Sequence, residues 1–245
     1  MLSILITGAN GRMGKTVQEA VEANPETKVG AIHDVGEDLK LAMTQAKCTI
    51  DFTVHDFTDQ VLETAVALKK PLVIGTTGHT EEQRAAIKDA AKSIPIVYAP
   101  NFSIGVNTLF WLTRKAAEVL GNTRCDIEVT EMHHRHKIDS PSGTARRILE
   151  ILNEATDTDY DKDIDHGRFG NIGPREQGKI GMHTLRGGDV VGDHTVMFAA
   201  DGERVELTHK ASSRMTFASG AVTAAVWLQN QENGLYDMQD VLGLS

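Results

Sequence analysis

Hydrophobic and polar positions alternate in two different ways along the first hundred residues. Short apolar runs end in turn residues, and they occupy positions 2–7, 28–34, 48–53, 71–76 and 95–99. Between these runs, apolar side chains recur at helical spacing over residues 13–21, 58–69 and 81–92. The remaining segment, 35–47, has room for only about two helical turns. Strands that alternate with helices predict a parallel sheet with right-handed crossovers.

The pattern changes after residue 103. The expected elements are a helix at 107–120, a strand at 126–132, a helix at 141–155, a long loop at 156–178, strands at 179–185, 194–200 and 204–209, a helix at 216–228 and a tail at 234–243. Asp201 and Gly202 between the last two strands are typical of a hairpin. We therefore predict an α/β fold, in which a Rossmann-like parallel-sheet domain is joined to a smaller α+β domain with an antiparallel or mixed sheet.

The composition is ordinary for a globular chain, with 40% apolar and 24% charged positions among 245 residues. No apolar run approaches the roughly 18 residues of a membrane span. The N-terminus lacks a basic leader, so we expect a cytoplasmic protein without membrane contact. A net charge of -9 argues against nucleic acid as a partner. Cys48 and Cys125 lie in apolar runs, which favours reduced, buried thiols over a disulfide or a metal site.

Three glycines, Gly8, Gly11 and Gly14, lie between the first predicted strand and the first predicted helix. Glycines in this context let backbone amides approach a pyrophosphate at a helix N-terminus. Asp34 ends the second strand 20 residues after Gly14, where an acid can bind the ribose hydroxyls of a dinucleotide. The spacing differs from the usual G-x-G-x-x-G, and a glycine-rich turn with a surface aspartate is the alternative. The candidate cofactor residues here are Gly8, Ala9, Asn10, Gly11, Arg12, Met13 and Asp34.

Two later segments follow strands of the same predicted sheet. Open α/β sheets bind ligands at the carboxyl ends of their strands, so both segments are candidates for contacts to ribose and nicotinamide, although either could be turn chemistry alone. They comprise Gly75, Thr76 and Thr77, and Ala99, Pro100, Asn101 and Phe102. Val35 follows Asp34 where a site for a 2′-phosphate would carry a cation, so we expect NADH to be accepted at least as well as NADPH. Arg12 and Lys15 could still neutralise a phosphate.

Residues 131–144 concentrate proton donors and anion-binding groups. A histidine suits a general acid, and Lys137 can hold a carboxylate. Ser140 and Pro141 suit an N-cap and the first position of a helix. The amides of Ser142, Gly143 and Thr144 would then face outward as an anion site. This combination suits a small dicarboxylate that is reduced by hydride.

Two other interpretations of this segment remain. His133, His134 and His136 could bind zinc, but their spacing matches no known metal motif and no cysteine pair supplements them, so we predict no metal. The segment could also be a solvated basic turn. The other histidines, His166, His183, His194 and His209, are interpreted as structural or surface residues.

The chain resembles the 4-hydroxy-tetrahydrodipicolinate reductase family, also called dihydrodipicolinate reductase, over essentially its whole length. The resemblance rests above all on the string His-His-x-x-Lys-x-Asp-x-Pro-Ser-Gly-Thr-Ala within residues 131–145. It also includes residues 7–14, 75–77, 99–103, 192–195 and 208–218 and the Gly-Leu-Tyr-Asp-Met tail. Ser140 stands where the family usually has alanine.

The resemblance implies reduction of 4-hydroxy-tetrahydrodipicolinate by NADH or NADPH in lysine and diaminopimelate biosynthesis. It assigns the proton donor to His133, proton donation or carboxylate anchoring to Lys137, and substrate binding to His134, Gly143 and Thr144. It further implies a dinucleotide-binding domain at 1–104 and 213–245, a substrate-binding and oligomerisation domain at 105–212, and a homotetramer. Alternatives are another Rossmann-type reductase, a semialdehyde dehydrogenase (which needs a nucleophilic cysteine) or a non-catalytic dinucleotide sensor.

Overall fold

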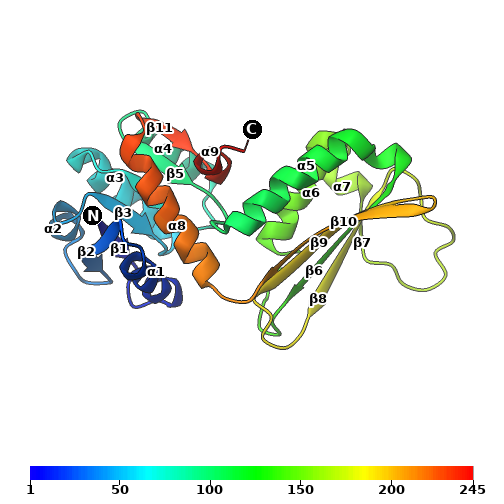
Figure 1. Ribbon diagram of the computed structural model, residues 1–245, viewed down its shortest axis with the longest axis horizontal. Helices are drawn as coiled ribbons and strands as arrows, with labels where there is room; N and C mark the ends of the chain where they lie inside the picture. Colours follow the sequence, from blue (N-terminus) through cyan, green and yellow to red (C-terminus); the bar gives the residue numbers. More distant parts are fainter. Residues whose placement is uncertain (245) are drawn as a thin grey trace. The chain divides into compact units, whose positions relative to one another are not determined.

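The structure, a computed structural model, describes residues 1–244 and divides into two compact units (Figure 1). The first unit contains residues 1–104 and the C-terminal segment from Arg214, and the second contains Gly105–Ser213. Among the described residues, no helix is long and apolar enough to cross a membrane.

The first unit is built on a parallel sheet of six strands, in the order β11-β5-β4-β3-β1-β2. The strands are β1 (Leu2–Thr7), β2 (Thr27–His33), β3 (Cys48–Asp51), β4 (Leu72–Ile74), β5 (Pro95–Tyr98) and β11 (Gly234–Tyr236). Successive residues of a strand point to opposite faces, and both faces are buried here; Ile4 and Ile6 belong to one core and Leu5 to the other. This arrangement explains the continuous apolar runs in the sequence.

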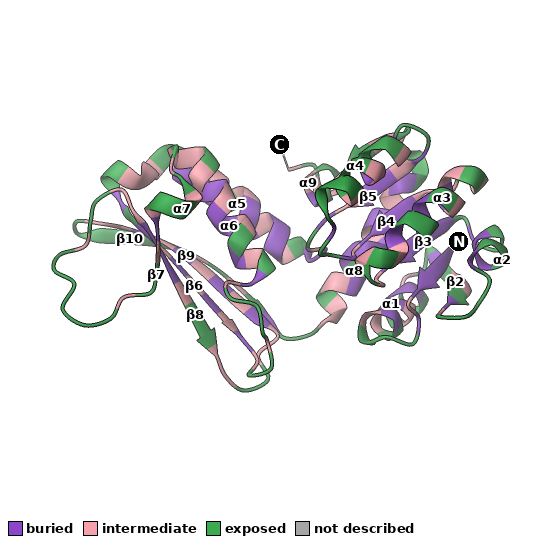
Figure 2. Cartoon of the chain, turned by 180° about the vertical axis from the view of Figure 1, so that it is seen from behind, coloured by how far each residue is buried: buried purple, intermediate pink, exposed green. Residues whose placement is uncertain are grey.

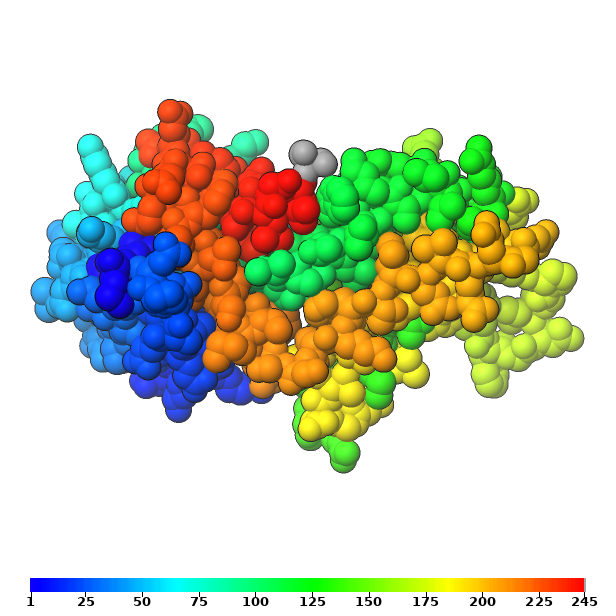
Figure 3. Space-filling model, in the orientation of Figure 1, coloured from blue at the N-terminus to red at the C-terminus, as the bar shows by residue number. Residues whose placement is uncertain are grey.

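Helices cover both faces of this sheet. They are α1 (Arg12–Ala23), α2 (Leu39–Thr44), α3 (Thr58–Leu68), α4 (Glu81–Ala90), α8 (Met215–Trp227) and α9 (Met238–Leu242), with 3-10 turns at His55–Phe57 and Leu228–Asn230. Helices α1, α8 and α9 share one core with the sheet, and α2, α3 and α4 share the other. Figure 2 shows the strands buried between these layers, and Figure 3 shows the C-terminal segment against the N-terminal residues of the same unit.

The strand order reverses between β1 and β3. The chain first runs outward from β1 to β2, and then in the other direction through β3, β4 and β5. The crevice at the carboxyl ends of the two strands at such a switch point is the usual ligand site of doubly wound sheets. The glycine turn follows β1, so the fold places it at this crevice.

The second unit is a mixed sheet covered by helices on one face (Figures 1 and 2). Its strands run in the order β10-β9-β6-β8-β7, where β6 is parallel to β8 and antiparallel to β9. The elements are α5 (Ile104–Arg124, kinked at Gly121), β6 (Asp126–His133), α6 (Gly143–Thr156), α7 (Tyr160–Asp163), β7 (Ile164–His166), β8 (Ile180–Arg186), β9 (Gly192–Ala200) and β10 (Glu203–Ala211). Helices α5 and α6 pack on the face that carries Ile127 and Val129.

The structure confirms the predicted fold class and corrects two segments. The expected loop at 156–178 contains α7 and β7, because Asp159 caps the α7 amides and Ile164 buries its side chain. The expected tail contains β11, which pairs with β5, and α9, which is capped by Asp237. These pieces are too short to show a periodic pattern in the sequence. The rest of the long loop is held to β6 by Arg168 and Arg175, which bind Glu128, while Phe169 is exposed.

Candidate active site

A cavity of about 380 Å³ lies at the carboxyl ends of β1, β2 and β3. It is lined by Gly8, Asn10, Gly11, His33, Asp34, Val35, Phe52, Thr53, Val54 and Phe57. The predicted glycines and Asp34 therefore meet at one site. The cavity also contains His33 and Phe57, whose rings stack with centroids 5.5 Å apart, and Phe52 and Thr53; none of these four was predicted from the sequence. A largely apolar pocket with a carboxylate suits the adenosine part of a dinucleotide.

The glycine turn is shaped by close contacts that side chains would prevent. Gly8 has a φ of +67°, and its carbonyl accepts a hydrogen bond from the Gly11 amide. A Cβ on Gly14 would lie 2.1 Å from the Gly8 carbonyl oxygen, so α1 can start close to the turn only with glycine there. Gly11 is the N-cap of α1, and within residues 1–244 no side chain caps this helix start. Its first amides are therefore suited to a pyrophosphate.

The side chain of Asp34, the candidate ribose ligand, is hydrogen-bonded to the glycine turn. One carboxylate oxygen accepts a hydrogen bond from the Asn10 amide at 2.7 Å, and the other accepts one from the Val35 amide at 2.8 Å. These two hydrogen bonds, the one from Asn10 first, lower the pKa of the Asp34 carboxyl. The group is thus ionised at neutral pH, and none of the described residues that line the cavity is a lysine or arginine.

A buried carboxylate behind the cavity, that of Asp51, was missed by the sequence analysis. Asp51 ends β3 and is 1% exposed, and it accepts hydrogen bonds from the hydroxyls of Thr7, Thr53 and Thr76 at 2.6, 2.7 and 2.6 Å. The Thr76 hydroxyl also accepts the Thr53 amide. The network ties together the carboxyl ends of β1, β3 and β4. Because the hydroxyl of Thr76 is engaged there, a contact from this residue to a cofactor would use its backbone.

The other predicted cofactor residues follow neighbouring strands at the same edge of the sheet. Gly75, Thr76 and Thr77 come after β4, and the Gly75 amide donates to the Asp51 carbonyl. Ala99 and Phe102 after β5 are buried in the core, whereas Pro100 is exposed. In the glycine turn, Ala9 is buried, and Arg12 and Met13 begin α1. The structure does not place these residues in the cavity lining.

In the second unit, the predicted catalytic and substrate-binding segment 131–144, called the strip from here on, begins near the end of β6. His133 is 8% exposed, and its Nδ1 donates to Oε2 of Glu131 at 2.5 Å. Arg186 of β8 donates to both oxygens of the same carboxylate, at 2.9 and 3.0 Å. Burial alone would raise the pKa of Glu131, but the hydrogen bonds from His133 and Arg186 outweigh it and lower the pKa to about 2. The sequence analysis did not identify Glu131 or Arg186 as site residues.

His194 also belongs to this site, although the sequence analysis interpreted it as structural. Its ring lies 5.2 Å from that of His133, and its Nε2 is 3.1 Å from the hydroxyl of Ser142. Burial, with the nearby charge of His133, lowers the pKa of His194 to about 3, so its ring is neutral at physiological pH. No motif in the sequence indicated this contact, because it joins β9 to the start of α6.

The start of α6 differs from the prediction. Ser142, not Ser140, is the N-cap, because its hydroxyl accepts the Ala145 amide; the Ser140–Pro141 peptide is cis. The Ser142 amide donates to Glu131 at 3.1 Å, so the expectation that it faces outward was wrong. Gly143 is exposed, with open space where a Cβ would lie. Gly143 and Thr144 therefore form the accessible part of this helix start.

The remaining strip residues follow β6 in a turn. The His134 amide donates to the Val190 carbonyl, and the Lys137 amide donates to the His134 carbonyl. The Lys137 ammonium forms an ion pair with Asp139 at 2.8 Å. Arg135 and His136 are exposed. His133, His134, Lys137, Gly143 and Thr144 all lie between the end of β6 and the first turn of α6.

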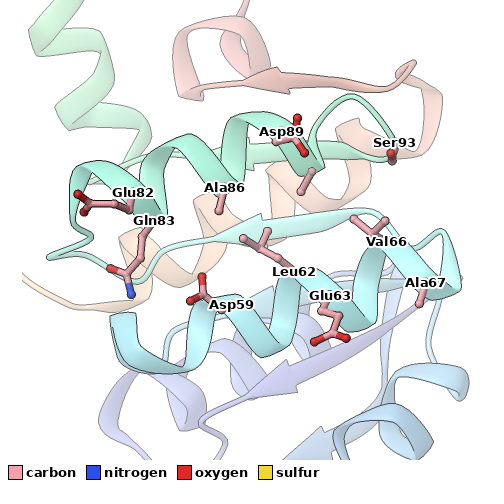
Figure 4. A pocket seen from close by; sticks show the side chains of 11 residues that line it. Asp59, Leu62, Glu63, Val66, Ala67, Glu82, Gln83, Ala86, Asp89 and Ser93 are labelled. Atoms are coloured by element: carbon pink, nitrogen blue, oxygen red, sulfur yellow. The ribbon is translucent and has the colours of Figure 1, made fainter.

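A second groove in the first unit, about 600 Å³, runs between α3 and α4 (Figure 4). Leu62, Val66 and Ala86 form its apolar part, and carboxylates such as Asp59 and Asp89 are spread along its two helices. These carboxylates do not converge on one point. No group of three or more metal-binding side chains occurs among the described residues.

A doubly wound sheet with a glycine turn at its switch point is the arrangement with which dinucleotide-dependent oxidoreductases bind their cofactor, and the second unit adds a buried histidine–carboxylate pair. Comparisons with known proteins identify the member of this class. The family model "Dihydrodipicolinate reductase, N-terminus" matches residues 2–102, and "Dihydrodipicolinate reductase, C-terminus" matches residues 105–242. The chain belongs to the dihydrodipicolinate reductase family, whose members use NADH or NADPH.

Two relatives and one solved structure illustrate the match. The 4-hydroxy-tetrahydrodipicolinate reductase of Akkermansia muciniphila is 65% identical over 245 residues, which cover 100% of this chain and 99% of the relative. The reductase of the same name from Neisseria meningitidis serogroup B is 47% identical, with 100% and 98% covered. The dipicolinate-bound dihydrodipicolinate reductase of Paenisporosarcina sp. TG-14 is 22% identical, with 98% of each chain covered and a TM-score of 0.79, and it shares the fold.

Proposed function

We propose that this chain reduces 4-hydroxy-tetrahydrodipicolinate to tetrahydrodipicolinate, a step of lysine and diaminopimelate biosynthesis. The substrate loses its hydroxyl as water, and the resulting conjugated ring gains a hydride at one carbon and a proton at the neighbouring carbon. The bound NADH or NADPH supplies the hydride and becomes the oxidised nucleotide. The observation that carries the proposal is His133, a buried histidine held by a carboxylate at the start of the predicted substrate strip.

His133 is proposed as the proton donor. Its Nδ1 is occupied by Glu131, so its Nε2 is the nitrogen that can deliver a proton. A Cβ on Gly192 would lie 2.9 Å from this Nε2, so the glycine leaves space there. The neutral His194 beside it adds no second positive charge.

The two carboxylates of the substrate are assigned to the residues after His133. Lys137 offers a positive charge, and its ion-pair partner, Asp139, is half exposed, so this ion pair can be exchanged for a substrate carboxylate. His134 and the exposed helix start at Gly143 and Thr144 complete the proposed binding site. Ser142 supports it indirectly, because its amide and hydroxyl are directed to Glu131, Ala145 and His194.

The cofactor is assigned to the first unit. The cavity at β1, β2 and β3 fits an adenosine, and the uncapped start of α1 fits a pyrophosphate. Gly75–Thr77 and Ala99–Phe102 would contact the remaining part of the cofactor through their backbone. Cys48 and Cys125 are buried free thiols, and burial raises the pKa of Cys48 to about 12. Neither thiol suits the nucleophile of a semialdehyde dehydrogenase.

A coupled assay tests the proposed function. The synthase that makes the substrate is mixed with this protein and NADH or NADPH, and absorbance at 340 nm is followed. We expect absorbance to fall only when synthase and reductase are both present. Cofactor binding without turnover would indicate a dinucleotide sensor, and turnover with a different carbonyl or imine substrate would indicate another Rossmann-type reductase.

A homotetramer in the cytoplasm is also part of the proposal. The sheet of the second unit carries α5 and α6 on one face, and half-buried Met132 and Met197 lie on the other. The same face also carries polar side chains such as Thr130, Thr195 and Asp193, and a mixed face of this kind is suited to association between copies of the chain. Light scattering should give about four times the 26.7 kDa mass of the chain, and a monomer at assay concentration would contradict this part. Cell fractionation tests the location.

A further inference from the structure

The carboxylate of Glu131 is completely buried on β6, and it accepts hydrogen bonds from His133, from Arg186 and from the Ser142 amide. We propose that Glu131 is the positioning residue for proton transfer: it fixes the ring of His133 and, through Arg186 and Ser142, the segment that holds the substrate. The proposal rests on the proposed function, because it assumes that His133 donates a proton.

The contact to His133 decides which ring nitrogen reacts. An ionised carboxylate only accepts hydrogen bonds, so Nδ1 of His133 must carry a proton when it faces Oε2 of Glu131. Protonated His133 then has its second proton on Nε2, and this is the proton that passes to the substrate carbon. After the transfer the ring is neutral. Its Nδ1 keeps its proton and still donates a hydrogen bond to Glu131. The negative carboxylate also stabilises the imidazolium before the transfer.

Glu131 can play this part only if it remains ionised while buried. A buried carboxylate without partners would take up a proton. Here Arg186 donates to both oxygens, and the Ser142 amide donates to Oε1 at 3.1 Å. The guanidinium neutralises the charge, and these three hydrogen bonds satisfy the carboxylate without removing its capacity to bind His133.

The same carboxylate connects the rest of the strip. Arg186 also donates a hydrogen bond of 2.6 Å to the backbone carbonyl of Asp139, which lies two residues after Lys137. Ser142, bound through its amide, is the N-cap of α6 and therefore sets where Gly143 and Thr144 lie. A change at Glu131 is thus expected to affect proton transfer first and substrate binding second.

Other ionisable groups lie near His133 or near its two neighbours, Glu131 and His194, and bear on any pH measurement. They are Glu131 on its own strand, Arg186 from β8, His194 from β9, His209 from β10 and Lys137 from the following turn. Burial keeps His194 neutral, and it also lowers the pKa of His209. Arg186 and Lys137 are the cations of this set. Among these neighbours, Glu131 is the negative group in direct contact with the ring.

The test is Glu131→Gln, with Glu128→Gln as a matched control. Glu128 lies on the same strand and also binds two arginines and a histidine (Arg168, Arg175 and His183), but on the opposite face and without contact to His133. Both variants lose a carboxylate that is paired with arginine, and the one at Glu128 is partly buried. Only Glu131→Gln should alter catalysis by the mechanism proposed here.

We expect Glu131→Gln to lower kcat by about 10-fold to 100-fold, which is less than the 10²–10⁴-fold worth of the general acid itself. The alkaline limit of the kcat profile should move to lower pH, because the imidazolium loses its negative partner. The dissociation constant for NADH should stay unchanged. Glu128→Gln should keep the wild-type pH profile. An unshifted profile in Glu131→Gln, or an equal shift in both variants, overturns the proposal.

A second measurement needs no variant at position 131 and no turnover. In the wild-type protein with nitrogen-15-labelled histidine, neutral His133, assigned by comparison with His133→Ala, should carry its proton on Nδ1. A proton on Nε2 overturns the proposal even if Glu131→Gln does not fold. Failure of the proposed function is a separate outcome, because it would be seen as absent turnover by the wild-type protein in the coupled assay.

Discussion

His133 is the residue whose replacement tests the chemistry most directly. His133→Ala removes the proposed proton donor from a site that does not include the nucleotide cavity. We expect kcat to fall by about 10²–10⁴-fold, the usual contribution of a general acid, while the dissociation constant for NADH stays the same. Stopped-flow turnover and a binding titration measure the two quantities. His136→Ala, in the same strip but exposed, serves as the control; near wild-type turnover by His133→Ala would exclude the role.

Lys137 is assigned to a substrate carboxylate. Its ammonium pairs with the half-exposed Asp139 at 2.8 Å, and a dianionic substrate would offer a stronger partner. Lys137→Ala should raise KM for the substrate by about 10-fold or more, since a charged hydrogen bond contributes roughly 1.5–3 kcal/mol. Lys137→Arg, which keeps the cation, should lose less. An unaltered KM in Lys137→Ala would contradict the assignment.

Asp34 and Val35 bear on the choice of cofactor. The Asp34 carboxyl is held ionised by the amides of Asn10 and Val35, and it would repel a 2′-phosphate. We therefore expect kcat/KM with NADH to equal or exceed that with NADPH. Steady-state kinetics with both nucleotides measure the ratio. A clear preference for NADPH would show that Arg12 or Lys15 of the glycine turn dominates instead.

At the scale of elements, the seating of α1 on the glycine turn depends on Gly14. Alanine at a helical position is normally better than glycine by about 1 kcal/mol. Here its Cβ would lie 2.1 Å from the Gly8 carbonyl oxygen, which is backbone and cannot move alone. The contact should outweigh the helix propensity, so Gly14→Ala should lower the free energy of unfolding by about 1–3 kcal/mol.

Gly11→Ala is the matched comparison for that change. Gly11 has an ordinary φ of -69°, and a Cβ there would have its nearest neighbour at 3.1 Å. Urea denaturation of both variants measures the difference. Equal stability of the two variants would show that the turn can adjust and that the contact at Gly14 does not fix the start of α1.

At the scale of the whole molecule, three strongly shifted groups lie in the second unit. The pKa values of Glu128 and Glu131 are lowered to about 2 because hydrogen bonds from arginine and histidine outweigh burial, and burial lowers that of His194 to about 3. Their ordinary values are 4.5 for glutamate and 6.5 for histidine. Below these ordinary values the unfolded chain binds protons that the folded chain does not.

The second unit should therefore lose stability as the pH falls. The loss begins at about pH 6.5, where His194 takes up a proton in the unfolded chain, and it continues from about pH 4.5 to 2, where the two glutamates do so. The chain's two tryptophans report on the units separately, since Trp111 lies in α5 and Trp227 in α8. Trp227→Phe should show a steep fall in the urea midpoint between pH 6 and 3, and Trp111→Phe a shallower one. Parallel curves would contradict this.

Much of the fold could be predicted from periodicity. The alternation of apolar runs and helical segments indicated the parallel sheet, because strands buried on both faces leave continuous apolar runs. Elements such as α3 and the β9–β10 hairpin were confirmed within a few residues. β7 and β11 were missed, because they are three-residue strands that depend on pairing with β8 and β5 rather than on their own pattern.

The sequence by itself determined the residues that act through local spacing. The glycine turn, Asp34 and the strip from His133 to Thr144 each lie within a short segment, so their chemistry could be inferred from order along the chain. Their individual roles remain predictions for the experiments above to test.

Only the tertiary structure decided which groups support these residues. Glu131 contacts His133 because strand residues two positions apart share a face, whereas Arg186 and His194 reach the site from β8 and β9. Asp51 likewise joins threonines from three strand ends. Such contacts depend on strand register and on burial, because a buried carboxylate must accept several hydrogen bonds from the elements around it. A linear sequence carries no direct signal for either property.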